Sequence, residues 1–203
     1  NKLSIKTLHY LGLSFLLSFL LINSILSILS VNFSFICCGL IYLTIVYIIS
    51  KFLDKKNQKV FIVLTYFFLL IYSSYAIISF FMVYENPLHD HLGDSDQIGY
   101  YKDALSLSNF SLLNIWDKAF TEFRFHESPL FYAWISTLHK LSGLNIYFGA
   151  LLQKLNIVFF ASFIPTILYL ILEKYTNYTK ALKWATLYGV FSFNFYYSAI
   201  LLR

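Results

Sequence analysis

Three long apolar runs occupy the first part of this chain. They extend from Leu8 to about Ser30, from Phe33 to Leu53 and from Val60 to Val83. A helix needs roughly 20 mostly apolar residues to cross the hydrocarbon core of a bilayer, so each run is long enough to span a membrane. Asn32 lies between the first two runs and marks a very short turn.

The later apolar runs are less regular. Leu130 to Leu141 is too short to cross alone and is broken by Gly143, whereas Ile146 to Leu172 and Trp184 to Leu202 are long enough. The sequence therefore predicts an all-α, polytopic transmembrane protein with about five spans, in which 130–141 is re-entrant or interfacial. If 130–141 crossed the membrane, the spans after it would be inverted.

Composition agrees with a membrane protein. Hydrophobic residues make up 59% of the 203 residues and charged residues 12%, and the mean hydropathy is +0.66. Soluble domains carry about 25% charged residues, so lipid must cover much of this surface. The net charge of +5 is not gathered into a patch, which argues against a nucleic-acid partner. We expect an integral, multi-pass protein of the bacterial inner membrane, with membrane lipids around it.

Lysines mark one side of the membrane. One group follows the second run, and another follows the run that ends at Leu172: Lys51, Lys55, Lys56 and Lys59, then Lys174, Lys180 and Lys183. Cytoplasmic loops are rich in Lys and Arg, so both groups and the amino terminus are predicted to be cytoplasmic. The chain starts without an initiator methionine and stops just after an apolar run. We expect a single transmembrane domain, residues 1–203, from a longer protein.

One polar stretch, residues 84–128, is called the acidic segment below. It holds eight of the ten acidic residues and three of the five histidines, and the orientation above predicts that it is extracytoplasmic. Ile98, Tyr101 and Leu105 have helical spacing. Ser111 can cap a second short helix with an apolar face of Leu112, Trp116, Ala119 or Phe120, and Phe123. These helices are predicted to lie flat in the membrane interface; a solvated loop with some local helix is the alternative.

The densest candidate chemistry runs from His89 to Asp96. His89, Asp90 and His91 are candidate ligands of a divalent cation, and Asp94 and Asp96 are candidate general bases. Asp96, Tyr100 and Ala104 are spaced to share one face of a helix, with Asp96 near its start. The alternative is that these acidic residues only keep a loop hydrated.

A second candidate group follows at the end of the acidic segment. Arg124 and His126 can bind a phosphate, and Glu127 can act as a second carboxylate or an ion-pair partner. An ordinary polar re-entry into the membrane is an equally open interpretation. Lys154 lies inside an apolar run, where it contacts an anionic lipid ligand or extends toward the interface. Cys37 and Cys38 are adjacent in an apolar run and indicate neither a disulfide nor a metal site.

Residues 84–175 resemble the amino-terminal part of a GT-C superfamily glycosyltransferase, the multi-span class that includes lipid-phosphate-dependent mannosyl- and arabinosyltransferases. Three motifs carry the resemblance. They are Gly93-Asp94-Ser95-Asp96 followed by Tyr100 and Ala104, Glu127-Ser128-Pro129-Leu130-Phe131-Tyr132 running to Leu141-Ser142-Gly143, and Leu155-Asn156 opening a span that ends at Tyr169-Leu170. The chain departs from the family at Gln97, where many members have a second acid, and at Ser128, where several have proline. It also has three spans before the acidic segment, whereas the better-known members have one.

The resemblance implies an enzyme of envelope polysaccharide biosynthesis. An aspartate in the first outer loop would be the catalytic base, matched best by Asp96 and next by Asp94, with Tyr100, Arg124, His126, Glu127 and Lys154 as candidate substrate-binding residues. The donor would be a polyprenyl-phosphate-linked sugar, and some members need a divalent cation such as Mg²⁺ or Mn²⁺.

Two other functions remain open from the sequence. A polysaccharide polymerase, for O-antigen or exopolysaccharide, would join lipid-linked sugars with similar loops. A membrane transporter or channel belongs to another class. The spans before the acidic segment carry no charged residue near their midpoints, whereas transport paths usually need polar sites there.

Overall fold

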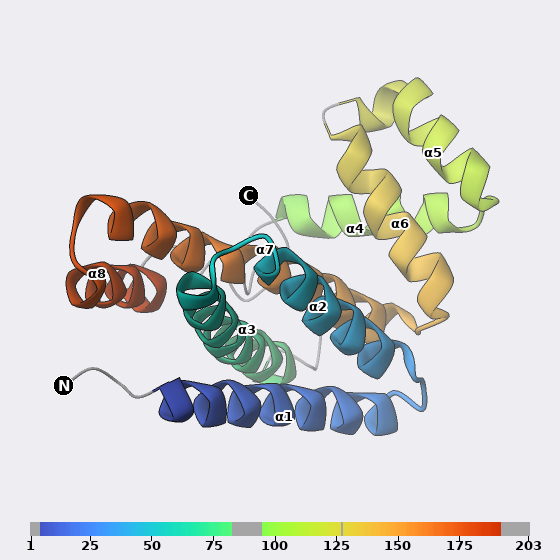
Figure 1. Ribbon diagram of the computed structural model, residues 1–203. Helices are drawn as coiled ribbons and strands as arrows, with labels where there is room; N and C mark the ends of the chain where they lie inside the picture. The colour runs from blue at the N-terminus through green and yellow to red at the C-terminus, as the bar shows by residue number, and fades with distance from the viewer. Residues whose placement is uncertain (1–4, 83–94, 127, 192–203) are drawn as a thin grey trace. The chain divides into compact units, whose positions relative to one another are not determined.

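The chain is helical throughout the part that the computed structural model describes, residues 5–82, 95–126 and 128–191, in which there is no strand. Figure 1 shows the elements in order. They are α1 Ile5–Leu29, α2 Ser34–Ser50, α3 Lys55–Met82, α4 Ser95–Ser108, α5 Leu112–Thr121, the 3₁₀ turn η1 Phe123–Phe125, α6 Pro129–Ser142, α7 Ile146–Tyr175 and α8 Tyr178–Phe191. The all-α prediction is confirmed.

Among the described residues, three helices are long and apolar enough to cross a membrane. These candidate spans are Tyr10–Leu29, Lys55–Met82 and Phe148–Tyr175. The apolar helix α2 has 17 residues, which gives a length of about 25 Å against a hydrocarbon core of about 30 Å. The predicted last span extends beyond Phe191, and that part lies outside the described residues.

The chain divides into two compact units. Of the described residues, 5–78 and 154–191 form unit 1, and 79–82, 95–126 and 128–153 form unit 2. Unit 1 thus contains α1, α2, most of α3 and α7, and α8, whereas unit 2 contains α4, α5, η1 and α6.

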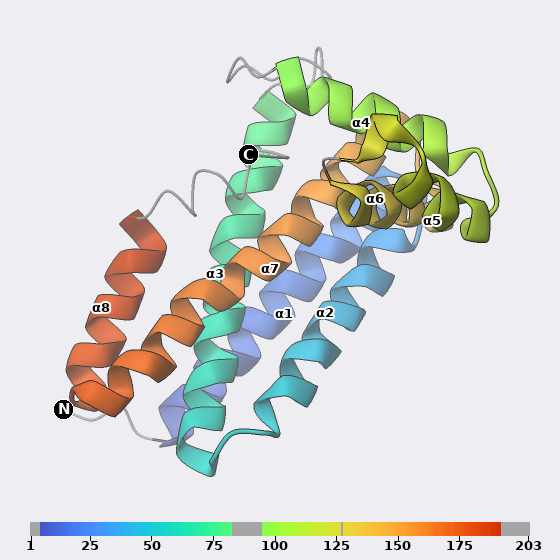
Figure 2. The same ribbon diagram turned by 90° about the horizontal axis from the view of Figure 1, so that it is seen from above.

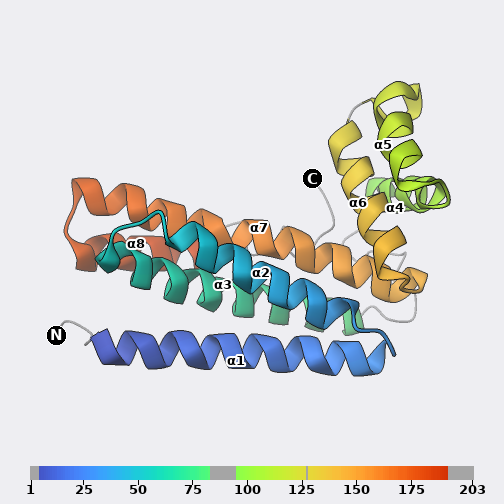
Figure 3. The same ribbon diagram turned by 45° about the vertical axis from the view of Figure 1, so that its right-hand side comes forward.

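Within unit 1, α3 and α7 run antiparallel. Lys56 at the start of α3 pairs with Glu173 near the end of α7. Farther along α3, the Thr65 hydroxyl donates to the Thr166 hydroxyl oxygen at 3.1 Å. Residue numbers therefore rise along α3 and fall along the partner positions of α7. Figure 3 shows the two helices with α1 and α2 running lengthwise beside one another. The chain consequently leaves α3 and re-enters α7 at the same end of this pair.

Tyrosines satisfy polar groups inside the apolar core of unit 1. The ring of Tyr42 stacks on Phe159 at 4.4 Å between centroids, and its hydroxyl donates to Asn156 Oδ1 at 3.3 Å. The Tyr72 hydroxyl donates to the Gly189 carbonyl at 2.8 Å. Since a buried polar group without a hydrogen bond is costly, these bonds fix which helices can face one another.

Unit 2 is a small helical group in which α6 packs on both α4 and α5 (Figure 2). Its core includes three alanines, Ala104, Ala119 and Ala133, which let the helices approach closely. The Phe125 ring fills the centre and lies 5.0 Å from the Tyr132 ring between centroids. The short helices predicted in the acidic segment are therefore present.

The predicted ends of the unit 2 helices are largely confirmed. Ser111 Oγ accepts from the Asn114 amide at 3.3 Å and caps α5. Gly143 ends α6 with a left-handed φ of 59°, a conformation that glycine adopts without a steric cost. Of the apolar face predicted for α5, only Ala119 is buried, together with Ile115, while Leu112, Trp116, Phe120 and Phe123 are exposed.

Candidate functional site

Helix α4 sets the register of the predicted catalytic residues. It begins at Ser95, so Asp96 is its second residue, and Tyr100 and Ala104 follow at intervals of four. These positions lie along one side of the helix, and Ala104 is fully buried in the unit 2 core. The prediction that these three residues lie on one helix, with Asp96 near its start, is confirmed for the backbone. Asp94 and the side chains of Asp96 and Tyr100 lie outside what the structure describes, so their roles stay predictions.

An ion pair between Arg124 and Asp103 joins the 3₁₀ turn to α4. A guanidinium nitrogen of Arg124 contacts Asp103 Oδ1. The pair follows from the geometry of η1, because burial of Phe125 in the core leaves its neighbour Arg124 at the surface. Asp103 is more enclosed than Arg124, with 18% of its side chain exposed against 58%.

The exposed guanidinium retains capacity for an anion. Arginine has five N–H donors in a planar fork, and one Asp103 oxygen engages a single nitrogen of Arg124. The guanidinium carbon also lies 5.8 Å from the centroid of the Phe125 ring. Asp103 and Phe125 thus hold Arg124 in place without using its whole donor set. The sequence did not predict this pair, since 21 residues separate its members.

His126 is held by its own turn. Its Nδ1 lies 2.6 Å from the Phe123 carbonyl oxygen, and its ring stacks on the Phe123 ring at 4.4 Å between centroids. The imidazole is therefore held in one orientation at the surface of unit 2, two residues after Arg124 in the sequence. Glu127, the next residue, lies outside the described residues.

Lys154 belongs to a different part of the fold. It is partly buried at the unit 1 end of α7, between Gln153 and the Leu155-Asn156 pair. Gln153 is buried, and neither its amide nitrogen nor its amide oxygen has a hydrogen-bond partner among the described residues. Arg124 and His126 belong to unit 2, whereas Lys154 belongs to unit 1.

The predicted metal ligands His89, Asp90 and His91 lie outside the described residues. Within the described part, no group of three or more His, Cys, Asp or Glu side chains could hold a metal ion. Cys37 and Cys38 are free thiols.

Two further polar groupings were not predicted. At the end of α6, Lys140 donates to the Ser108 carbonyl at 3.1 Å, which satisfies a carbonyl at the end of α4. In the same helix, burial lowers the pKa of His139 from its ordinary value of 6.5. The Lys140 bond ties the end of α6 to α4.

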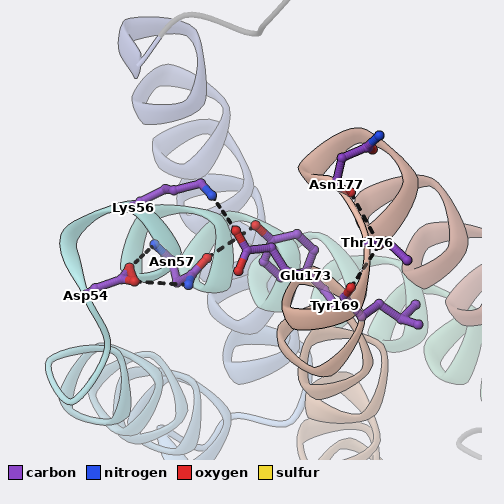
Figure 4. A network of polar contacts seen from close by, with 8 residues as sticks. Asp54, Lys56, Asn57, Tyr169, Glu173, Thr176 and Asn177 are labelled. Atoms are coloured by element: carbon purple, nitrogen blue, oxygen red, sulfur yellow. Dashed lines mark hydrogen bonds and ion pairs between the residues drawn. The ribbon is translucent and has the colours of Figure 1, made fainter.

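The second grouping lies in unit 1, where the two lysine-rich loops meet (Figure 4). Asp54 Oδ1 accepts from the Asn57 amide at 2.7 Å, the Tyr169 hydroxyl donates to Asn57 Oδ1 at 3.3 Å, and Lys56 pairs with Glu173. Asp54 therefore caps α3, which explains why this helix begins at Lys55 rather than at Val60. The loops before α3 and after α7 lie at the same end of unit 1.

No protein-family model, no curated protein and no solved structure matches this chain. The resemblance to GT-C glycosyltransferases thus depends on the motifs of the sequence itself.

Proposed function

We propose that the protein is an integral-membrane glycosyltransferase that moves a sugar from a polyprenyl-phosphate donor to an acceptor on the extracytoplasmic side. The observation that carries the proposal is the start of α4 at Ser95. It puts Asp96 in the first helical turn, with Tyr100 and Ala104 following at intervals of four, the spacing on which the resemblance to the family rests.

The antiparallel pairing of α3 and α7 supports the proposed sidedness. When two neighbouring spans are antiparallel, the chain between them makes an even number of crossings. This number is zero rather than two, because α6 is too short to cross twice. The acidic segment and α6 then lie on one side of the membrane. The opposite end carries the joined lysine-rich loops, which favours the cytoplasm. Five spans are reached if α2 crosses the membrane and if the residues after Phe191 extend α8 to the length of a span.

The proposed reaction is a direct displacement at the anomeric carbon. The acceptor hydroxyl oxygen attacks this carbon, its proton passes to the carboxylate of Asp96 or Asp94, and the bond from the sugar to the phosphate oxygen breaks. Polyprenyl phosphate leaves with the electron pair, and the anomeric configuration inverts. The ionised carboxylate is the form that a general base needs.

Arg124 is the proposed phosphate-binding residue of unit 2. Its exposed guanidinium suits the bidentate geometry of a phosphate, and the Asp103 contact holds it in position. His126, oriented by the Phe123 carbonyl, is proposed to assist. Tyr100, Glu127 and Lys154 stay candidate substrate-binding residues, and the divalent-cation site at His89, Asp90 and His91 stays a prediction.

The buried polar groups of the candidate spans argue against a transporter. Among the described residues, the buried polar side chains are serines, threonines, asparagines and a glutamine, without a buried Asp, Glu, Lys, Arg or His. Ion- and proton-coupled transport paths are usually lined by ionisable groups. These helices are instead suited to a fixed scaffold.

The test is sugar transfer by the full-length protein in proteoliposomes containing labelled polyprenyl-phosphate sugars. Asp96→Asn and Asp94→Asn are compared with Asp117→Asn, a matched control because Asp117 is an exposed aspartate on α5 of the same unit. Loss of a general base lowers kcat by roughly 10²–10⁴-fold, so one of the first two variants should show this loss while the control transfers normally. Wild-type rates in both Asp96→Asn and Asp94→Asn would refute the assignment of the base.

Sidedness is tested separately in sealed vesicles. In a background with Cys37 and Cys38 changed to serine, Asn109→Cys places a thiol at an exposed position after α4. A membrane-impermeant thiol reagent should label it from the extracytoplasmic side. Labelling only from the cytoplasmic side would contradict the proposed orientation.

A further inference from the structure

The apolar face of α5 is wider than the surface that its neighbours cover. At about 100° per residue, its apolar positions fill an arc of roughly 160° around the helix. One edge of this arc holds Ile115 and Ala119, both fully buried. The rest of the arc holds the large exposed side chains Leu112, Leu113, Trp116 and Phe120. More than half of the arc of apolar positions is therefore only partly covered by the described residues of unit 2, from 38% exposed at Trp116 to 85% at Leu113.

The exposed apolar surface continues onto α6. Leu130 and Trp134 are one turn apart on that helix and are 62% and 40% exposed. The indole N–H of Trp116 donates to the Thr137 hydroxyl oxygen at 3.1 Å. This bond ties the exposed arc of α5 to the exposed side of α6, so the two stripes form one surface. We call it the α5–α6 face, formed by Leu112, Leu113, Trp116, Phe120, Leu130 and Trp134.

The opposite side of α5 is polar. Asn114, Asp117 and Thr121 occupy it and are exposed, and Lys118 pairs with Glu122. Such a division, with Trp, Phe and Leu on one side and polar groups on the other, is typical of helices that lie in the plane of a membrane interface. A fully soluble face would not gather so many large apolar side chains.

The covalent neighbours of unit 2 indicate which partner covers this face. Only Gly143, Leu144 and Asn145 separate α6 from α7, which contains the candidate span Phe148–Tyr175. Unit 2 is therefore tethered to a candidate span by a connection of only three residues. Its two tryptophans also match the preference of that residue for the headgroup level.

We propose that the α5–α6 face is embedded in the lipid interface and that unit 2 is a membrane-surface platform. The partner is the bilayer itself, at the boundary between headgroups and acyl chains. The polar side of α5 faces water. This proposal is independent of the enzymatic activity proposed above.

The test uses spin labels on adjacent residues of α5 in the full-length protein, reconstituted in bilayer nanodiscs. Leu113→Cys and Phe120→Cys report the α5–α6 face, and Asn114→Cys and Thr121→Cys are matched controls one residue later, all four at exposed positions. Cys37 and Cys38 are changed to serine. Collision with oxygen, which concentrates in hydrocarbon, is compared with collision with a water-soluble nickel complex.

The logarithm of the oxygen-to-nickel accessibility ratio should be positive at 113 and 120 and negative at 114 and 121. Negative values at all four positions would mean that the face is in water, which overturns the proposal. Low accessibility to both reagents at 113 and 120 would mean that protein covers the face, and this result also overturns it. Without labels, Trp184→Phe leaves Trp116 and Trp134, whose fluorescence should be quenched by lipids brominated near the headgroup; unquenched fluorescence contradicts the proposal.

Discussion

Gly189 on α8 permits the close approach of α8 to the core of unit 1. A Cβ added at this position would lie 2.9 Å from Pro165 Cγ and closer still to the Phe68 ring. Phe68 is fully buried, so its ring cannot move away without displacing its neighbours. Small residues serve this purpose at helix contacts in membranes. Gly189→Ala should therefore destabilise the fold.

The magnitude follows from three contributions. Overpacking a buried site costs about 1–3 kcal/mol. A shift of α8 also weakens the hydrogen bond from Tyr72 to the Gly189 carbonyl, which costs about 0.5–1.5 kcal/mol. Alanine favours the helix over glycine by about 1 kcal/mol. The net loss in the free energy of unfolding should be about 2 kcal/mol.

The assay is reversible unfolding in mixed micelles, followed by the helical circular dichroism signal. Gly12→Ala is the matched control, because its Cβ would meet only Val63 Cγ2 at 3.1 Å, the end of a side chain. Phe68→Leu should partly rescue Gly189→Ala, giving a coupling energy of about 1 kcal/mol or more. If Gly189→Ala is neutral or stabilising, the close packing of α8 against Phe68 is wrong.

Three further predictions concern unit 2. Ser111→Ala removes the cap of α5 and should lower stability by about 1 kcal/mol; Ser106→Ala, which removes no helix cap, is the comparison in the same unfolding assay. Burial lowers the pKa of His139 below 6.5 in the folded protein. As the pH drops through 6.5, the unfolded state therefore binds the proton first, and the free energy of unfolding should fall until the pH passes the lower pKa of the folded state. His139→Gln should remove this pH dependence, and an unchanged pH dependence would contradict the assignment to His139. Arg124→Gln and Asp103→Asn should each cost at most about 1 kcal/mol, as expected for a partly exposed pair. Arg124→Gln should raise KM for the donor strongly, and Asp103→Asn, which removes only the contact that positions the guanidinium, should raise it less; an unchanged KM in Arg124→Gln would contradict the phosphate-binding role.

The sequence predicts the helices well because hydrophobic length and end signals are local. The run from Leu8 and the break at Gly143 depend on residues that are neighbours in the chain, and Ser111 precedes the helix that it caps. The third apolar run begins at Val60, whereas α3 begins five residues earlier at Lys55, because Asp54 caps the helix there.

The contacts between distant segments could not be predicted from the sequence. Arg124 and Asp103 meet because α6 brings α4 and η1 together, and no local pattern encodes that pairing. Likewise, hydropathy assigns both lysine-rich loops to one side, but it does not indicate that Lys56 reaches Glu173. Asp94 and the predicted metal ligands lie in residues 83–94, outside the described part, so the sequence alone supports them, whereas Asp96 is also supported by the start of α4 at Ser95.

The most direct test of the proposed activity is to follow both products of the donor in one experiment. Proteoliposomes containing the full-length protein receive a polyprenyl-phosphate sugar labelled in the sugar and, separately, in the lipid, together with an acceptor fraction. The glycosyltransferase proposal predicts that free polyprenyl phosphate and glycosylated acceptor appear in equal amounts, and that Asp96→Asn or Asp94→Asn abolishes both. Movement of the intact donor across the membrane without cleavage would contradict the proposal and indicate transport.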